Sequence, residues 1–335
     1  SDDLSFTSYN WTAPPLPPMD TPVKAAVILT ALFVTLALAW TVSLALERLS
    51  LDVRGEDPRL RLYEWVLVAI WGCFVVPAAL TIVALFGYPV VKNLVMSFQN
   101  YTLRTFINGK APWVGLQNYV AVVTDDLFSK ALTNTALFTI GSIAGQFVIG
   151  MLLALFFHKN FPLNGVLRAL FLLPWLIPLI VGSAAWRAIL EQDSGILNVT
   201  LESLGIIDAP IPWLTSPNVA LIAIILVNIW LGIPFNVTLL YSGLQDIPDE
   251  LYEAGAMDGA TGWKAFWNIT WPNLRAVVSV VLMLGVIYTL KVLDIILGLT
   301  QGGPANATQT IATQSYQRSF VEFKFGQGAA LSNIL

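Results

Sequence analysis

Six stretches of the chain are long and apolar enough to cross a lipid bilayer as helices. The hydrocarbon core of a bilayer is about 30 Å thick and needs about 20 apolar residues in helical form, and lipid offers an exposed backbone no hydrogen-bond partner. The stretches are 23–46, 65–91, 131–157, 166–189, 219–240 and 275–297. Only 11% of the residues are charged, against about 25% in soluble domains. We therefore predict an all-α polytopic membrane protein.

The composition excludes several classes of function. The net charge of −4 leaves no basic face for nucleic acid. The single cysteine, Cys73, cannot form an intrachain disulfide, and the single histidine, His158, belongs to no cluster of metal ligands. No phosphate-binding loop occurs, because the only Gly-Lys pair, Gly109-Lys110, lacks the upstream glycine. We therefore expect no cofactor, no metal and no catalytic residue on this chain.

The N-terminal region indicates how the chain is oriented. Residues 1–22 are polar and proline-rich and are expected to form an extended tail. The apolar run 23–46 is longer than the core of a signal peptide and follows an acidic leader, which favours an uncleaved anchor over a cleaved signal. The linker that follows is rich in arginine, which places it in the cytoplasm. Its arginines are Arg48, Arg54, Arg59 and Arg61. Because each membrane span takes the chain to the opposite side, the N-terminus is then expected outside and residues 243–274 in the cytoplasm.

The sequence between the last two apolar stretches has a different character, reading GLQDIPDELYEAGAMDGATGWKAFWNITWP over residues 243–272. Pro248 and the acidic residues after it suit the first turn of a helix, and Gly259 suits its end. Thr261 is expected to cap a second short helix, and Pro272 is expected to mark the entry to the next membrane helix.

The first of these short helices needs support, because a helix of about ten residues is marginal on its own in water. The small residues between 254 and 260 let another backbone approach closely, while Leu251, Tyr252 and Met257 can be buried. The residues alone leave two interpretations. The segment is either a docking element for another protein or a tight loop that packs on the ends of its own helices.

This segment resembles the EAA loop of bacterial ABC importer permeases, whose pattern is EAA, three residues, G, nine residues, I, one residue, LP. The chain has the same spacing, with Gly255 in place of the last alanine of EAA and Trp271 in place of leucine. The resemblance implies that this loop contacts an ATPase subunit. The residues that it assigns to this contact are Glu253, Ala254, Gly255, Asp258, Gly259, Ala260, Ile269 and Pro272.

Other parts of the chain resemble the carbohydrate branch of the same family, which includes the large maltose permease subunit and the glycerol-3-phosphate permease. The segments that carry the resemblance are YPVVKNLVMSF (88–98), GLQNY (115–119), RALFLLPWLIP (168–178), NIWLGIPF (228–235) and LTQGGPANATQT (299–310). They indicate a permease core at 64–335, with the EAA loop at 243–274, preceded by an extra transmembrane helix and linker at 23–63 and the tail at 1–22. The family fold is a type I permease core of six transmembrane helices, and we expect the last one to be cut short at Leu335.

The resemblance implies a function and a set of partners. The function is that of the transmembrane permease subunit of an ATP-driven importer, which moves a sugar or sugar-like solute into a bacterial cell by alternating access. The implied partners are a second permease subunit, two ATPase subunits and an extracytoplasmic solute-binding protein. ATP and Mg²⁺ would be bound by the partner ATPase, whose closure would move the short cytoplasmic helix and open the pore outward.

Polar and aromatic residues inside the apolar stretches indicate a sugar pathway, because polar groups are costly in lipid and are usually functional there. Gly232 and Pro234 loosen the middle of the stretch 219–240. By side-chain chemistry the candidates are Asn228, Trp230, Asn236, Tyr288, Thr289, Lys291 and Asp294. The resemblance implies sugar contacts for Asn228, Leu231, Gly232, Phe235, Gly285, Tyr288 and Thr289, to which we add Lys291.

Two alternatives concern the charged pair and the whole chain. Lys291 and Asp294 are three residues apart on one predicted helix, so they can neutralise each other's charge. The alternative is that Lys291 lines the pathway and favours an anionic or strongly polar sugar. The chain as a whole is alternatively an ATP-independent secondary transporter or channel, which predicts buried carboxylates in several helices or inverted repeats. A membrane enzyme would need a catalytic constellation that the sequence lacks.

Overall fold

The computed structural model describes residues 72, 75–76, 78–159 and 161–335 of the chain. The regular elements of these residues are helices, and one isolated antiparallel bridge joins Gln99 to Trp113. The chain divides into two compact units, residues 1–93 and 94–335. The predicted N-terminal helix at 23–46 and the domain boundaries predicted after residues 22 and 63 lie outside the described residues.

The described helices begin with one apolar helix over Ala78–Ser97, which contains a π-helical turn, η1 (Val83–Gly87), and α3 (Tyr88–Ser97). The other helices belong to the second unit. They are α4 (Leu103–Asn108), α5 (Gln117–Val123), α6 (Asp126–His158), α7 (Asn164–Phe171), α8 (Leu173–Leu176), α9 (Leu179–Ile189), α10 (Ile196–Ser203), α11 (Ala220–Gln245), α12 (Asp249–Met257), α13 (Trp263–Ala265), η2 (Phe266–Thr270), α14 (Trp271–Leu290), α15 (Asp294–Leu299), α16 (Ile311–Tyr316), η3 (Gln317–Val321) and α17 (Phe325–Ile334).

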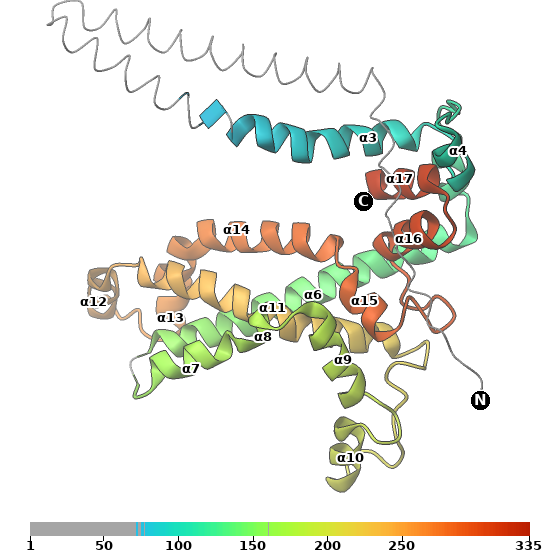
Figure 1. Ribbon diagram of the computed structural model, residues 1–335. Helices are drawn as coiled ribbons and strands as arrows, with labels where there is room; N and C mark the ends of the chain where they lie inside the picture. The colour runs from blue at the N-terminus through green and yellow to red at the C-terminus, as the bar shows by residue number, and fades with distance from the viewer. Residues whose placement is uncertain (1–71, 73–74, 77, 160) are drawn as a thin grey trace, which may run out of the picture. The chain divides into compact units, whose positions relative to one another are not determined.

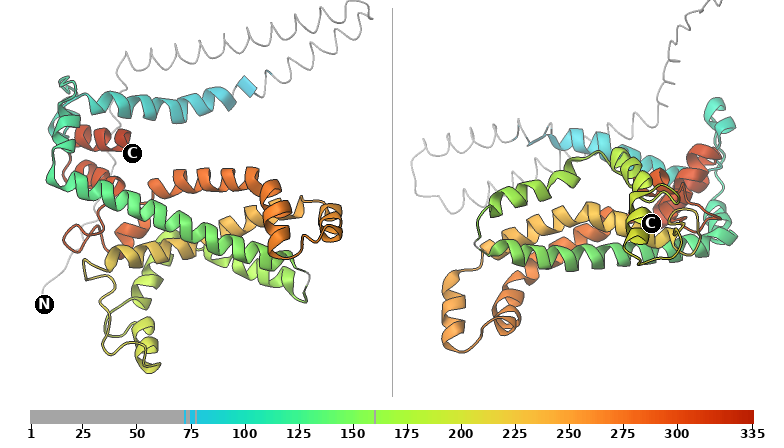
Figure 2. Two further views of the ribbon diagram at one scale, coloured as in Figure 1. Left: turned by 180° about the vertical axis from the view of Figure 1, so that it is seen from behind. Right: turned by 90° about the horizontal axis from the view of Figure 1, so that it is seen from below.

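The centre of the second unit is formed by α6, α11 and α14, which lie side by side (Figures 1 and 2). The start of α6 is capped by the Asp125 side chain, which accepts a hydrogen bond from a backbone N–H at 2.9 Å. Buried apolar side chains form two main clusters along the bundle. One contains Phe138 and Ile224, and the other contains Leu240 and Leu274. These clusters hold the three helices together along most of their length.

The described residues contain four helices that are long and apolar enough to cross a membrane: Ala78–Ser97, Asp126–His158, Ala220–Gln245 and Trp263–Leu290. A fifth candidate is a bent pair, Asn164–Leu176 with Leu179–Ile189. These five correspond to the predicted apolar stretches other than 23–46.

In the bent pair, α9 turns by 96° from the direction of α7 and α8, as in a broken span or a re-entrant loop. The break falls at Ile177, which has extended backbone angles of φ −76° and ψ 128° and is followed by Pro178. A proline ring disfavours the helical conformation of the residue before it. The break therefore directs α9 away from the bundle toward α10 (Figure 1).

The structure corrects the sequence prediction after α12, because Trp263–Leu290 is one continuous helix made of α13, η2 and α14. The predicted cap at Thr261 is wrong. Pro272 lies in the first turn of α14, as predicted, but the short helix before it is continuous with α14. α13 begins without a side-chain cap, and in η2 the Trp271 N–H donates to the Phe266 C=O, five residues back. This π-turn shifts the hydrogen-bond register just before Pro272, so the missing proline N–H does not end the helix.

A second correction concerns the outer end of the stretch predicted at 275–297. Helix α14 ends at Leu290 with Lys291 as its C-cap, and α15 begins only at Asp294. Lys291 and Asp294 therefore do not share a helix face, and they form no ion pair among those of the described residues. The Lys291 ammonium instead lies 4.9 Å from the centre of the Tyr288 ring. A cation at a helix C-terminus is favourable, so this position needs no carboxylate partner.

Glycines let α6 and α11 approach each other closely. A Cβ atom on Gly150 would lie 2.7 Å from the Asn236 Cβ, and a Cβ atom on Gly232 would overlap the amide group of Gln146. Small residues at such contacts are typical of packed membrane helices, because association in lipid depends on close van der Waals contact.

We expect Gly150→Ala to destabilise the fold although alanine favours helix formation. The added methyl group must displace Asn236, and overpacking of this kind typically costs about 1–3 kcal/mol. The measurement is the thermal unfolding midpoint of the purified protein in detergent. Gly87→Ala is the matched control, because its Cβ would meet only Val83 at an ordinary 3.7 Å. An equal or higher midpoint for Gly150→Ala would contradict the close-contact role.

Candidate functional site

The short helix α12 lies at one end of the three-helix bundle (Figures 1 and 2). Pro248 precedes it as the N-cap, and two acidic residues occupy its first turn, where negative charge is favourable. The helix ends in a Schellman motif, in which the Ala260 N–H donates to the Gly255 C=O at 2.8 Å. Gly259 has a φ of 76°, which only glycine adopts without strain. The predicted start near Pro248 and the predicted end at Gly259 are confirmed.

One side of α12 packs on the helix that follows it. The Tyr252 and Thr270 hydroxyl oxygens are 3.0 Å apart, within hydrogen-bond distance. The Ile269 side chain occupies the space next to Gly255 that a Cβ would need. The atom in the way is the end of the Ile269 side chain, so the alanine of the EAA pattern would require only a small shift there. The structure thus brings together Gly255 and Ile269, two of the predicted coupling residues.

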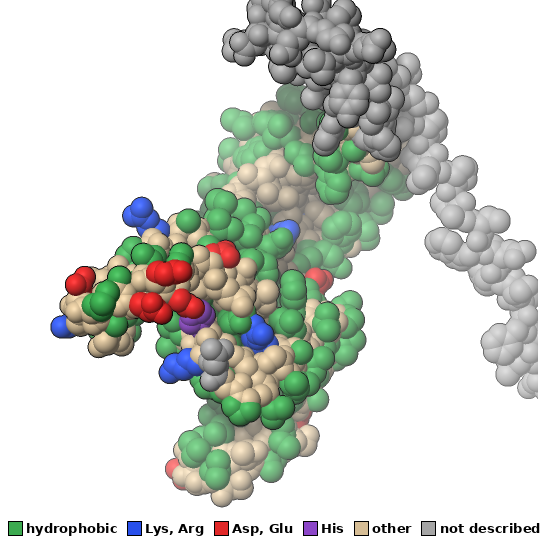
Figure 3. Space-filling model, turned by 90° about the vertical axis from the view of Figure 1, so that its left-hand side faces the viewer, with side chains coloured by type: hydrophobic (Ala, Val, Ile, Leu, Met, Phe, Trp, Pro, Cys, Tyr) green, Lys and Arg blue, Asp and Glu red, His purple; other side chains and the backbone are tan. Residues whose placement is uncertain are grey.

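The other side of α12 is exposed, and none of its residues is buried. Leu251 is 42% exposed and Met257 is 84% exposed. Glu253, Ala254 and Asp258 are also exposed. Acidic side chains gather on this end of the molecule (Figure 3). Contiguous exposed apolar side chains surrounded by charge are typical of protein-binding surfaces.

An aromatic cluster lies where α8, α11 and α14 meet. The Phe235 ring on α11 is 6.0 Å, centroid to centroid, from both the Trp175 ring on α8 and the Tyr288 ring on α14. Trp175 is 56% exposed and Tyr288 is 52% exposed, so their faces are accessible. Phe235 is ten residues from Gln245, the last residue of α11, which places it about 15 Å along the helix axis from that end. The cluster therefore meets α11 within its length, away from both of its ends.

This cluster unites three of the predicted sugar-contact residues, Phe235, Tyr288 and Lys291, and the others lie elsewhere. Asn228 and Gly232 face α6, where Gln146 Nε2 donates to the Asn228 C=O at 2.9 Å and packs on Gly232. The remaining residues either face a neighbouring helix or are buried, namely Leu231, Gly285 and Thr289.

The contact between α6 and α11 carries buried polar groups. Asn228 Nδ2, Thr139 Oγ1 and Ser142 Oγ have no hydrogen-bond partner among the described residues. Each unsatisfied buried group typically costs about 1–3 kcal/mol.

Sequence reasoning missed two residues of this region, Trp175 and Gln146. Each had a visible signal. Trp175 lies between two prolines in LPWLIP, away from any predicted membrane surface, and Gln146 is an amide in the middle of the stretch 131–157. Both are exceptions to the apolar aliphatic pattern of the helix that contains them.

A polar cavity of about 540 Å³ opens between the residues after α9, the residues before α11 and the loop after α15. Its lining includes Arg187, Glu191, Asp193, Trp213 and Pro304. Hydrogen bonds from Ser194, its backbone N–H first and its hydroxyl second, hold the pKa of the Glu191 carboxyl below its usual range. Glu191 is therefore ionised at neutral pH. Among the described residues, no group of three or more His, Cys, Asp or Glu side chains could hold a metal ion.

Comparison with known proteins identifies the class of this chain. Residues 146–334 match the family described as "Binding-protein-dependent transport system inner membrane component". The chain is 37% identical to the trehalose/maltose transport system permease protein MalF of Thermococcus litoralis, over 68% of this chain and 76% of that protein. It is 32% identical to the sulfoquinovosyl glycerol transport system permease protein SmoG of Agrobacterium fabrum, over 77% of this chain and 83% of that protein. It is 30% identical to the diacetylchitobiose uptake system permease protein DasB of Streptomyces coelicolor, over 76% of this chain and 79% of that protein.

A solved structure shows the same fold. The crystal structure of a bacterial ABC transporter involved in the import of the acidic polysaccharide alginate superimposes with a TM-score of 0.69 and 22% identity, covering 86% of this chain and 92% of the other.

The apolar bundle and these matches define a membrane-embedded permease. The chain belongs to the family of inner membrane components of binding-protein-dependent transport systems. The sequence prediction of an ABC importer permease is confirmed.

Proposed function

We propose that this chain forms one half of the pore of an ATP-driven importer for a sugar or sugar-like solute. The names of three relatives refer to the transport of trehalose and maltose, of sulfoquinovosyl glycerol and of diacetylchitobiose. These solutes share polyhydroxylated rings. Such rings have an apolar face that stacks on aromatic side chains and hydroxyl groups that need hydrogen-bond partners.

The observation that carries the assignment to sugars is the cluster of Trp175, Phe235 and Tyr288. Two of its rings are more than half exposed, and the Lys291 ammonium lies over the Tyr288 ring. Three aromatic rings from three different helices form an adaptable surface for a sugar ring, and Lys291 can donate hydrogen bonds to its hydroxyl or carboxylate groups. The unpartnered amide of Asn228 and the Gly232 backbone line the neighbouring contact of α11 with α6.

The proposal includes the partners and orientation of the chain. A second permease would complete the pore, two ATPase subunits would bind ATP and Mg²⁺ below it, and an external binding protein would deliver the solute. Residues 243–274 would face the cytoplasm and the N-terminus would face outward. One of the structures similar in fold contains an alginate transporter in complex with a substrate-bound periplasmic protein.

Coupling would occur through α12. Its exposed face, Leu251, Ala254 and Met257 with the adjacent acidic residues, would enter a groove of the ATPase. This supports the docking interpretation over a tight loop, since a loop packed on its own helix ends would bury Leu251 and Met257. This contact would be bordered or shaped by Glu253, Asp258, Gly259 and Ala260. Ile269 would transmit the displacement of α12 to α14.

The test is to purify the tagged chain with its natural partners and reconstitute the complex in liposomes. We expect a second permease and an ATPase to copurify, and we expect solute uptake to require both ATP and the binding protein. Uptake by the chain alone, driven by an ion gradient and insensitive to ATP, would contradict the proposal and support the secondary-transporter alternative.

A further inference from the structure

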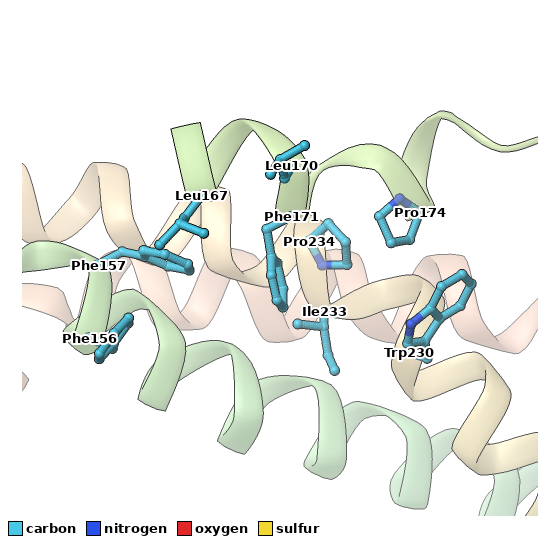
Figure 4. A pocket seen from close by; sticks show the side chains of 9 residues that line it. All are labelled: Phe156, Phe157, Leu167, Leu170, Phe171, Pro174, Trp230, Ile233 and Pro234. Carbon is cyan, nitrogen blue, oxygen red and sulfur yellow. The ribbon is translucent and has the colours of Figure 1, made fainter. Parts of the chain in front are cut away.

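An apolar cavity opens on the bundle beside α8 and α11, the helices that also carry Trp175 and Phe235. Its volume is about 420 Å³, and it lies between the end of α6, the helices α7 and α8, and α11 (Figure 4). Its lining consists of Phe156, Phe157, Leu167, Leu170, Phe171, Pro174, Trp230, Ile233 and Pro234. Apart from the Trp230 indole N–H, these side chains offer no hydrogen-bonding group. A sugar would lose its hydrogen bonds to water here, so the cavity suits a hydrocarbon chain.

A second cavity of about 280 Å³ adjoins the first and shares Phe171 and Pro234 with it. Its lining includes Arg168, Thr238 and Tyr241. The second cavity therefore adds a positive charge and two hydroxyl groups at the edge of an apolar space.

Arg168 lacks an anionic partner within the described part of the chain. Its guanidinium carbon lies 4.3 Å from the centre of the Tyr241 ring, and its Nε is buried without a hydrogen-bond acceptor. Arg168 takes part in none of the ion pairs found among the described residues. The residue as a whole is only partly buried, so an anion can reach the guanidinium and accept a hydrogen bond from its unpaired N–H.

The position of Arg168 along the helix matches the depth of a lipid headgroup. It lies one turn into α7, which starts at Asn164 directly after the turn that follows α6. This turn is at the same end of the bundle as α12 (Figures 1 and 2). Basic side chains between membrane helices at this depth bind anionic headgroups.

We propose that the two cavities form a binding site for one anionic phospholipid. The phosphate accepts hydrogen bonds from Arg168, and an acyl chain lies against Phe171, Ile233 and Pro234. Charge complementarity at Arg168 and the apolar lining beyond it select this occupant over a free phosphate ion, which would leave the apolar space unfilled. The site does not depend on the identity of the transported solute.

The test compares the wild-type complex with Arg168→Gln in nanodiscs, using native mass spectrometry to count retained phosphatidylglycerol. We expect retention of phosphatidylglycerol to fall by about fivefold or more in Arg168→Gln, as for loss of one basic residue beside an anionic headgroup. Lys159→Gln is the control, because Lys159 is an exposed cation at the same end of the bundle but outside both cavities. It should retain the lipid as the wild type does.

A second variant tests the apolar part of the site. Leu167→Trp fills the larger cavity while leaving Arg168 in place, and it should also reduce retention. Equal retention by Arg168→Gln and wild type, or displacement of the lipid by inorganic phosphate, would overturn the proposal. Equal retention by the wild type of phosphatidylglycerol and of phosphatidylcholine, which is zwitterionic and has no net charge, would overturn it as well.

Discussion

Met257→Lys is expected to release the ATPase subunits from the transporter and to abolish uptake. The Met257 side chain is 84% exposed at the end of α12, so within this chain its replacement removes little packing. Loss of one central apolar contact in an interface typically costs 2 kcal/mol or more, which corresponds to about 30-fold weaker binding. The acidic surface of α12 implies a basic groove on the partner, so a lysine would be repelled as well.

The measurement is the amount of ATPase that copurifies with the tagged permease, together with uptake by the reconstituted complex. Met257→Leu is the matched control, because it keeps an apolar side chain of similar volume. A loss of copurified ATPase or of uptake would not result from unfolding of α12, because a lysine near a helix C-terminus stabilises the helix. Normal assembly and uptake by Met257→Lys would show that this face of α12 does not dock.

Tyr288→Ala is expected to lower uptake at low solute concentration by about tenfold. The change removes one stacking surface and the ring on which the Lys291 ammonium rests. Aromatic stacking and a cation–π contact each contribute about 1 kcal/mol, and about 1.4 kcal/mol corresponds to a tenfold change. Tyr288→Phe retains the ring and should preserve most of the uptake.

Uptake is measured with the reconstituted complex at matched protein amounts, over a range of binding-protein concentrations. Ile287→Ala is the control, because Ile287 is on the same helix and is similarly exposed, at 51%, yet has no part in the ring contacts. If Tyr288→Ala transported the solute as well as Ile287→Ala does, the aromatic cluster would not be the sugar site.

The membrane spans and the limits of α12 were predictable because each depends on local chemistry. Lipid imposes the same length and apolarity on every span. Pro248 and Gly259 restrict the backbone in ways that no neighbouring element can change. The corresponding parts of the chain therefore fold as their own residues dictate.

The arrangement of the candidate sugar site was predictable only in part, because it depends on what covers each helix at each depth. Leu231 and Phe235 are four residues apart and share a face of α11. At the depth of Leu231, however, this face is buried next to Gly182 of α9, in a cluster that includes residues of α15. Phe235 instead meets Trp175 and Tyr288. The break between Leu290 and Asp294, which creates α15, contains no glycine or proline. This break was therefore not predictable from the residue types.

The continuous helix from Trp263 to Leu290 has a mechanical consequence. Its 28 residues form a rod about 40 Å long, which touches α12 near its first turns and carries Tyr288 near its far tip. A tilt of about 5° about the near end would move Tyr288 by about 3 Å over that length. Rigid-body tilt of this one helix would convert a small displacement of α12 into a change in the spacing of the aromatic rings. No chain of intervening side-chain rearrangements would be needed.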